Sequence, residues 1–505
     1  MTGTLLPLAV AVPLLAAALT AVVPSRTVRA VILLATHLAA VAFGVVLVVA
    51  VDGGEVLVSN VGLWPNGIAI PFVADMFSAL MMTVTALLTL VCSWFGVVAG
   101  DSDRRYFAPL VLVLSAGVYG ALFTGDLFNL FVFIEVMLLP SYGLIAIFGG
   151  ARRLSAGRLY VTTNLLTSTI FLIGVGLVYG VAGTVNIAEL AGAARESPLV
   201  ASACAVVLVA LCVKAAVVPV HGWLTQTYPD ASPAVRALFS GLHTKVAIYA
   251  IYRIYAVIFE GESTYLWIAL LVTCATMLVG VFGAVGENEA RTILTFHMVS
   301  QIGYILLGVA LFGPIGLTAG IFYLLHHMIV KASLFLSTGA VETTYGTDTL
   351  GSVQGLAKRE PLVAAAFFGA ALSLAGLPPF SGFVAKLLLA EAAVEERRFL
   401  VLAVVIVVSL LTLMSMLKIW KGMFMGNYVA ADRPLVPVGG GGPTRAAAQA
   451  DPRSPRIPLR LAGPALVLTA ATLCVGLGAQ GVLVLVEQAA AGLYDPAAYV
   501  EAVLR

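Results

Sequence analysis

The sequence predicts an all-α polytopic membrane protein with about fourteen transmembrane helices. Composition is the first observation, because a chain of 505 residues with 61% hydrophobic residues, 10% charged residues and a mean hydropathy of +1.05 is not a soluble domain. The second is a series of apolar runs, each long enough to cross a hydrocarbon core of about 30 Å. The third is a pair of proline-containing breaks within two of these runs.

The expected spans follow one another with short polar breaks between most of them. In chain order they cover residues 5–23, 27–50, 72–98, 107–124, 127–148, 159–182, 199–219, 235–259, 264–284, 291–312, 315–340, 361–388, 399–424 and 461–487. The first is expected to stay in the membrane rather than to be removed as a signal peptide. Residues 1–4 contain no Lys or Arg, and the chain continues to span afterwards.

The two proline breaks suggest an internal repeat. Pro219 follows Lys214 in the seventh span, and Pro378 and Pro379 precede Lys386 in the twelfth. Proline removes a backbone donor and clashes with the preceding turn, so both helices should be interrupted at membrane depth. The broken spans are five helices apart, which suggests that a unit of five helices occurs twice. Because five is odd, the second unit must have the opposite orientation in the membrane. We therefore expect two inverted five-helix repeats, spans 4–8 and 9–13.

This repeat gives the expected domain organisation. Residues 1–100 form the N-terminal helices 1–3, residues 101–260 the first repeat and residues 261–428 the second. Residues 429–460, rich in Gly, Pro and Arg, form a cytoplasmic loop. Residues 461–505 supply the C-terminal helix and tail.

The positions of basic residues predict the orientation. Lys and Arg accumulate in cytoplasmic loops, and with both termini outside, the outer side carries only Arg195, Arg397, Arg398 and Arg505. The abundance of Ala, Val and Gly, and of Arg over Lys, indicates a bacterium, so the expected location is the bacterial cell membrane. The net charge is +2, and the basic residues follow the membrane topology rather than gathering in one patch, so the sequence requires no nucleic-acid partner.

Several classes of cofactor site are missing from the sequence. The five cysteines form no CxxC, haem-attachment or zinc pattern. No GxGxxG or P-loop points to a nucleotide or flavin. We therefore expect no cofactor, and the sequence identifies no metal ligands. Energy must come from an ion gradient or from a partner.

Charged residues inside the spans are the strongest functional signal. Each costs roughly 2.5 to 3.5 kcal/mol at the centre of a spanning helix, so residues of this kind are usually functional. The candidates are Glu135, Lys214, Lys245, Lys331 and Lys386, with His326 and His327 beside Lys331.

Helical spacing indicates which of these groups share a face. His327 and Lys331 are four residues apart, and so are Lys245 and Tyr249, whereas His326 is turned by about 100° from His327. Histidine suits a proton relay. Glu135 is the natural counter-charge for a lysine. The alternatives are that a lysine near a helix end only extends its amine to the interface, and that a histidine only packs.

Six sequence runs resemble one membrane-protein family, over about residues 70 to 425. The chain is similar to the antiporter-like subunits shared by Mrp-type cation/proton antiporters and proton-pumping NADH:quinone oxidoreductase. The runs are GDLFNLFVFIE (125–135), VKAAVVPVHGWL (213–224), GLHTKVAIYAIYR (241–253), SQIGY (300–304), HHMIVKASLF (326–335) and SLAGLPPFSGF (373–383).

The resemblance implies a role for each candidate residue in a half-channel mechanism. Glu135 and Lys214 would be a control pair, and Lys245 the central proton-binding site. His326, His327 and Lys331 would form the central relay, and Lys386 the terminal lysine. Other membrane subunits of a hetero-oligomeric complex would be the partners, with protons and Na+ as the ions and the lipid bilayer as the surroundings.

Within the family, three features are similar to the D-type antiporter subunit. They are the lysine at position 386, a length of 505 residues, and the expectation that no lateral helix follows the last span. Three function classes remain open. The first is a secondary antiporter subunit, which is not an enzyme. The second is a proton-pumping module of a respiratory or hydrogenase complex, and the third is a structural membrane anchor.

Overall fold

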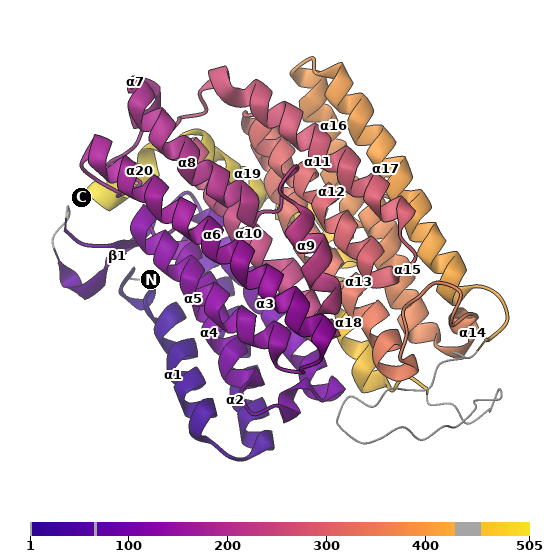
Figure 1. The fold of residues 1–505 in the computed structure, drawn as a ribbon. Coiled ribbons are helices and arrows are strands. Elements are labelled where there is room, and N and C mark those ends of the chain that lie inside the picture. Colours follow the sequence, from indigo (N-terminus) through magenta and orange to yellow (C-terminus); the bar gives the residue numbers. More distant parts are fainter. Residues whose placement is uncertain (1–2, 65–67, 430–455) are drawn as a thin grey trace.

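Helices make up most of the structure (Figure 1), a computed structural model that describes residues 3–64, 68–429 and 456–505. The helices are α1 (Leu8–Val22), α2 (Arg26–Ala50), α3 (Met76–Ala99), α4 (Phe107–Phe123), α5 (Leu127–Ala146), α6 (Ala151–Ala182), α7 (Ala193–Glu196), α8 (Pro198–Lys214), α9 (Gly222–Thr227), α10 (Pro233–Val257), α11 (Leu266–Gly286), α12 (Ala290–Ala310), α13 (Pro314–Tyr345), α14 (Leu356–Arg359), α15 (Pro361–Ala375), α16 (Ser381–Glu395), α17 (Phe399–Ile419), α18 (Leu459–Leu477), α19 (Ala479–Tyr494) and α20 (Ala497–Leu504).

The predicted class is confirmed. Among the described residues, ten helices are long and apolar enough to cross a membrane, and α4, α8 and α15 are shorter apolar helices. Each of the fourteen predicted spans coincides with a helix or with a pair of consecutive helices. The sixth begins earlier than predicted, at Ala151, because Arg152, Arg153 and Arg158 extend the helix beyond its apolar part.

Local sequence explains where several helices begin. Asp75 caps α3 by accepting a hydrogen bond from the Ser78 amide, and the Ser78 hydroxyl bonds back to the Asp75 amide. Asp126 caps α5 by accepting from the amide of Asn129. Proline stands in the first turn of α8, α10, α13 and α15, where its missing N–H costs nothing.

Two local features differ from the prediction. Residues 72–74, expected to begin the third span, belong instead to strand β2 (Pro71–Ala74), which pairs antiparallel with β1 (Leu57–Asn60). The last span is divided at Gly478 into α18 and α19. Apolar composition alone does not distinguish a short buried strand from the first turn of a helix, so the hairpin was not predicted.

The seventh and twelfth spans are both interrupted, as predicted. Helix α8 ends at Lys214, five residues before Pro219, and α9 follows the break. Helix α15 ends at Ala375, where Gly376 takes a left-handed conformation with φ of 87°, and α16 resumes at Ser381. The sequence predicted the breaks but not their boundaries.

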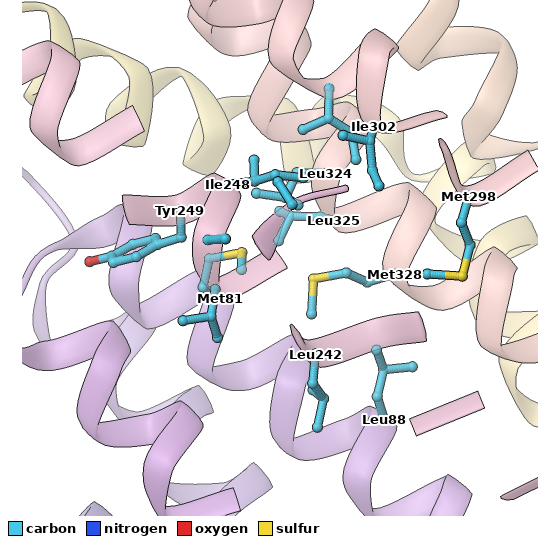
Figure 2. Close-up of a cluster of buried hydrophobic side chains, with 14 of the residues drawn as sticks. Met81, Leu88, Leu242, Ile248, Tyr249, Met298, Ile302, Leu324, Leu325 and Met328 are labelled. Carbon is cyan, nitrogen blue, oxygen red and sulfur yellow. The ribbon is translucent and has the colours of Figure 1, made fainter. Parts of the chain in front are cut away.

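Helix α13 lies at the centre of the molecule. Its most apolar part is entirely buried, and it packs against α3, α10, α12, α15, α16, α18 and α19. Figure 2 shows apolar side chains of α13 meeting those of three of these helices, including Met328 of α13, Met81 of α3, Leu242 of α10 and Met298 of α12. The core therefore surrounds the helices that carry Lys245 and Lys331.

The two ends of the described chain lie on the same side of the bundle. The short 3-10 helix η1 (Gly3–Leu5) and the C-terminal helix α20 both contact β1 (Figure 1). This placement agrees with an even number of membrane crossings. The predicted cytoplasmic loop, residues 429–460, lies mostly outside the described residues.

Candidate functional site

The four lysines predicted from the sequence are buried, on four different helices. Lys245 and Lys331 are 0% exposed, Lys214 is 5% exposed and Lys386 is 7% exposed. Glu135 is half-buried on α5. None of the four lysines extends its amine to a polar interface, so the alternative in which they merely extend to the membrane surface is not supported by their burial.

Glu135 and Lys214 meet through a third residue. Lys214 donates from Nζ to the hydroxyl of Ser168 at 3.0 Å, and Ser168 donates to Oε1 of Glu135. Ser168 lies on α6, between α5 and α8, and is itself buried. The two charged side chains are therefore bridged by one hydroxyl. The sequence did not single out Ser168, because a serine in a long apolar helix is unremarkable.

Lys245 lies on α10, with few polar neighbours. Its Nζ donates to the hydroxyl of Thr244 at 3.0 Å. Tyr249, predicted to share its helix face, donates its hydroxyl to the carbonyl of Leu122 on α4 instead of contacting the lysine. Lys245 lies within electrostatic range of His327 and Lys331 on α13.

The two neighbouring histidines of α13 have different surroundings. His326 forms a 2.8 Å hydrogen bond through Nδ1 with the hydroxyl of Ser381, the first residue of α16. Within the described residues, neither ring nitrogen of His327 has a hydrogen-bond partner, and Nζ of Lys331 has none either. The Lys331 amine lies 5.6 Å from the centre of the Phe335 ring. The helix thus holds two buried titratable groups without polar partners.

Lys386 is held at the break of the twelfth span. Its Nζ donates to the carbonyl of Ala375, the last residue of α15, at 2.8 Å, and to the hydroxyl of Ser409 at 2.9 Å. Ser409 of α17 donates to the same carbonyl at 3.0 Å. The break in the helix therefore supplies the carbonyl that binds the lysine, since interrupting a helix frees carbonyls at its end.

Two further histidines lie among the lysines. His297 of α12 is fully buried, both of its ring nitrogens lack partners among the described residues, and it lies within electrostatic range of Lys331 and Lys386. His243 of α10 lies near Lys214 and bonds weakly to the Tyr228 hydroxyl at 3.4 Å. The sequence did not single out either histidine, because their contacts are to distant parts of the chain.

Electrostatic interactions connect these groups in pairs. They link Lys214 with His243, Lys245 with His327 and Lys331, and His297 with Lys331 and Lys386. Together the groups form a row that runs from α8 and α10, in the first predicted repeat, to α12, α13 and α16, in the second. No group of three or more His, Cys, Asp or Glu that could hold a metal ion occurs in residues 3–64, 68–429 and 456–505.

An ion-pair network of arginines and carboxylates joins α10, in the first predicted repeat, to α12 and α13, in the second. Buried Arg236 of α10 contacts Glu342 of α13 at 2.8 Å, and Arg291 of α12 contacts the same carboxylate at 3.4 Å. A cavity of about 300 Å³ beside them is lined by Arg152, Asp230 and Glu342, among others. The network fixes the loops at one end of α10, α12 and α13.

Asp101 lies near this network, in the turn between α3 and α4. Burial raises its pKa to about 6, although the hydrogen bond donated by Ser232 opposes the shift.

Known proteins resemble this chain over most of its length. Residues 124–412 match the family described as NADH:quinone oxidoreductase/Mrp antiporter, TM. The D-type subunit of the Na(+)/H(+) antiporter from Alkalihalophilus pseudofirmus is 36% identical over 91% of this chain and 90% of its own length.

Two solved structures resemble the whole chain. A chain of the Mrp complex from Dietzia sp. DQ12-45-1b has a TM-score of 0.96 and 57% identity, and the match covers all of both chains. A chain of the membrane-bound sulfane sulfur reductase, an archaeal respiratory membrane complex, has a TM-score of 0.88 and 26% identity, with coverage of 99% and 100%. The resemblance to a D-type antiporter subunit is confirmed, and this chain belongs to the NADH:quinone oxidoreductase/Mrp antiporter family as an antiporter-like membrane subunit.

Proposed function

We propose that this chain is the proton-translocating subunit of a multi-subunit monovalent cation/proton antiporter, with Na+ as the exchanged cation. The observation that carries the proposal is the row of buried lysines and histidines, which passes between helices and lacks polar partners at His327 and Lys331 within the described residues. A purely structural set of buried charges would be paired. Unpaired titratable groups in series suit groups that gain and lose protons in turn.

The role of each residue is the one that the family resemblance implies, and the contacts of several residues support it. Glu135 and Lys214 act as the control pair, since the Ser168 hydroxyl lets the carboxylate stabilise or release the lysine. Lys245 is the central proton-binding site. His326, His327 and Lys331 relay protons within α13, and Lys386 at the helix break is the terminal lysine. Half-channels on opposite sides of the membrane meet at this row.

The proposed setting is a bacterial cell membrane with both termini outside. The arginines and lysines of the loops support this orientation, because most of them fall in the predicted inner loops when both termini are outside. Other membrane subunits complete the transporter. The similar chain from Dietzia belongs to an Mrp complex, which supports partners of this kind.

A second candidate is a proton-pumping module of a redox complex. The observation that favours it is the similarity to a chain of an archaeal respiratory membrane complex. The two candidates differ in their partners. An antiporter needs only small multi-spanning subunits, whereas a redox pump needs peripheral proteins with flavin or iron–sulfur clusters.

Gentle affinity purification of this chain from its native membrane tests the proposal. Mass spectrometry of the accompanying proteins and an absorbance scan identify the complex. We expect small hydrophobic subunits and no flavin or iron–sulfur absorbance. Peripheral redox subunits that copurify with their chromophores would overturn the antiporter assignment in favour of the redox pump.

A further inference from the structure

Arg253 is a buried cation that the proposed relay does not use. It lies near the end of α10, is 3% exposed, and pairs through Nη2 with Oδ2 of Asp75 at 2.7 Å. The same nitrogen donates to the Tyr249 hydroxyl at 3.3 Å. Its Nη1 has no partner in the part of the chain that the structure describes. Placing a guanidinium here is costly, which calls for a reason beyond packing.

Arg253 lies on the same face of α10 as Lys245. Lys245, Tyr249 and Arg253 follow one another at intervals of four residues, so they form one stripe along the helix. With a rise of 1.5 Å per residue, Arg253 is about 12 Å further along the axis, toward the side on which η1 and α20 lie. A proton leaving Lys245 along this face toward that side would meet Tyr249 and then Arg253.

The C-terminal helix covers this stripe from outside. Tyr499 of α20 is 3% exposed, and its ring centre lies 4.7 Å from the guanidinium carbon of Arg253. Beneath it, Phe77 of α3 packs on Tyr249 with ring centroids 4.7 Å apart. Asp75 is fixed because it also caps α3. Aromatic rings and an ion pair therefore line the stripe between Lys245 and the C-terminal helix.

We propose that Tyr499, Arg253 and Asp75 form a barrier that prevents protons bound at Lys245 from leaking to the side on which the termini lie. Constrictions that exclude water, together with a fixed arginine charge, stop the passage of protons and cations in other membrane pores. Here the ion pair ties α3 to α10, and the tyrosine ring of α20 closes the remaining opening. The inference rests on the proposed role of Lys245 as a proton-binding site.

Passive proton leak through the assembled complex tests the barrier. The complex with wild-type or variant chain is reconstituted into liposomes, a pH gradient is imposed in Na+-free medium, and its decay is followed with a pH-sensitive dye. We expect Tyr499→Ala to speed the decay several-fold and Tyr499→Phe, which keeps the ring, to speed it much less. Tyr494→Ala is the matched control, because Tyr494 is 53% exposed at the end of α19.

Combining variants separates the barrier from a structural role. Adding Lys245→Ala to Tyr499→Ala should return the decay to the wild-type rate, since the leak then lacks its proton-binding group. A leak that persists in the double variant, or wild-type decay in Tyr499→Ala, overturns the barrier. If Tyr499→Ala does not assemble, Tyr499→Val decides the same question, because it also removes the ring that fills the opening: decay faster than wild type supports the barrier, and wild-type decay overturns it. Antiport by Lys245→Ala alone would instead contradict the proposed function.

Discussion

The ammonium of Lys214 and the carboxylate of Glu135 are joined by a single hydroxyl, that of Ser168. The lysine donates to the serine at 3.0 Å and the serine donates to the carboxylate. This geometry differs from a direct ion pair, since the Ser168 hydroxyl contacts both charges. It also brings together three helices, α5, α6 and α8, at the Lys214 end of the row of lysines.

Ser168→Ala is therefore expected to slow exchange without removing the protein from the membrane. Hydrogen bonds to charged groups contribute about 1.5 to 3 kcal/mol, so the loss should be about tenfold or more in the rate of Na+-driven proton movement in vesicles. Ser202→Ala is the matched control, because Ser202 lies on α8 but bonds only to its own helix, at Pro198. Equal rates in Ser168→Ala and the control would rule out the bridge.

Removing either charge of the pair should have a larger effect. We expect Glu135→Ala and Lys214→Ala each to abolish exchange while the chain remains in the membrane, since the remaining charge then has no partner to modulate it. The measurement is antiport in vesicles, normalised to the amount of chain found by immunoblot. Normal antiport in either variant would refute the control-pair assignment.

Lys386 and the serine that holds it give a third prediction. Lys386→Ala is expected to block transport, and Ser409→Ala to reduce it, because Ser409 positions the amine at the carbonyl of Ala375. Thr412→Val serves as control on the same helix, since the Thr412 hydroxyl bonds only within α17, to Val408. Proton exchange at the wild-type rate by vesicles that carry Lys386→Ala would show that this lysine has no transport role.

The ion-pair network of Arg236, Arg291 and Glu342 is expected to stabilise the folded chain. Glu342→Ala leaves buried Arg236 without its carboxylate, which should cost about 3 to 5 kcal/mol and lower the Tm of the purified complex. Glu501→Ala removes the exposed pair with Arg505 and is expected to change stability by less than about 1 kcal/mol. Similar Tm values for the two variants would contradict a structural role for Glu342.

Asp101 predicts how stability depends on pH. Its folded pKa, about 6, exceeds the usual value of 3.8, so the folded chain holds the proton more tightly than the unfolded chain. The cost of ionisation therefore appears as the pH rises from about 4 and is complete above about 6. One pKa unit corresponds to about 1.4 kcal/mol, which gives a cost on the order of 3 kcal/mol at neutral pH.

The Asp101→Asn variant measures this cost. Its Tm should exceed that of wild type at pH 7 and match it below about pH 3, where Asp101 is protonated in both folded and unfolded chains. Asp103→Asn is the control, since Asp103 is 55% exposed and pairs with Arg26 at the surface. A Tm difference that does not change with pH would show that ionisation of Asp101 is not its cause.

Much of the fold could be predicted from the sequence, because bilayer length and apolar composition define a span without knowledge of its neighbours. The breaks after Lys214 and before Lys386 could be predicted for a similar reason, since proline acts on its own helix. The division at Gly478 and the hairpin of β1 and β2 could not, because neither changes the apolar composition enough to separate helix from strand or one helix from two.

The sequence indicated which charged residues lie inside the apolar spans, but not which residues they contact. Charged residues inside apolar runs are conspicuous, which is why all four lysines were found. Their partners are not, because Ser168 lies 33 residues from Glu135 and 46 residues from Lys214 along the chain. Likewise, helical spacing joined His327 to Lys331, whereas the hydrogen bond that is present joins His326 to Ser381, 55 residues away.

Na+-driven proton movement by the reconstituted complex tests the central claim most directly. Liposomes that contain the complex with wild-type chain or with Lys245→Ala receive an inward Na+ gradient, and the internal pH is followed with a dye. We predict that protons leave the wild-type liposomes and that the internal pH of the Lys245→Ala liposomes stays constant, at equal amounts of complex. Equal proton movement in both would contradict the assignment of Lys245 as the central proton-binding site.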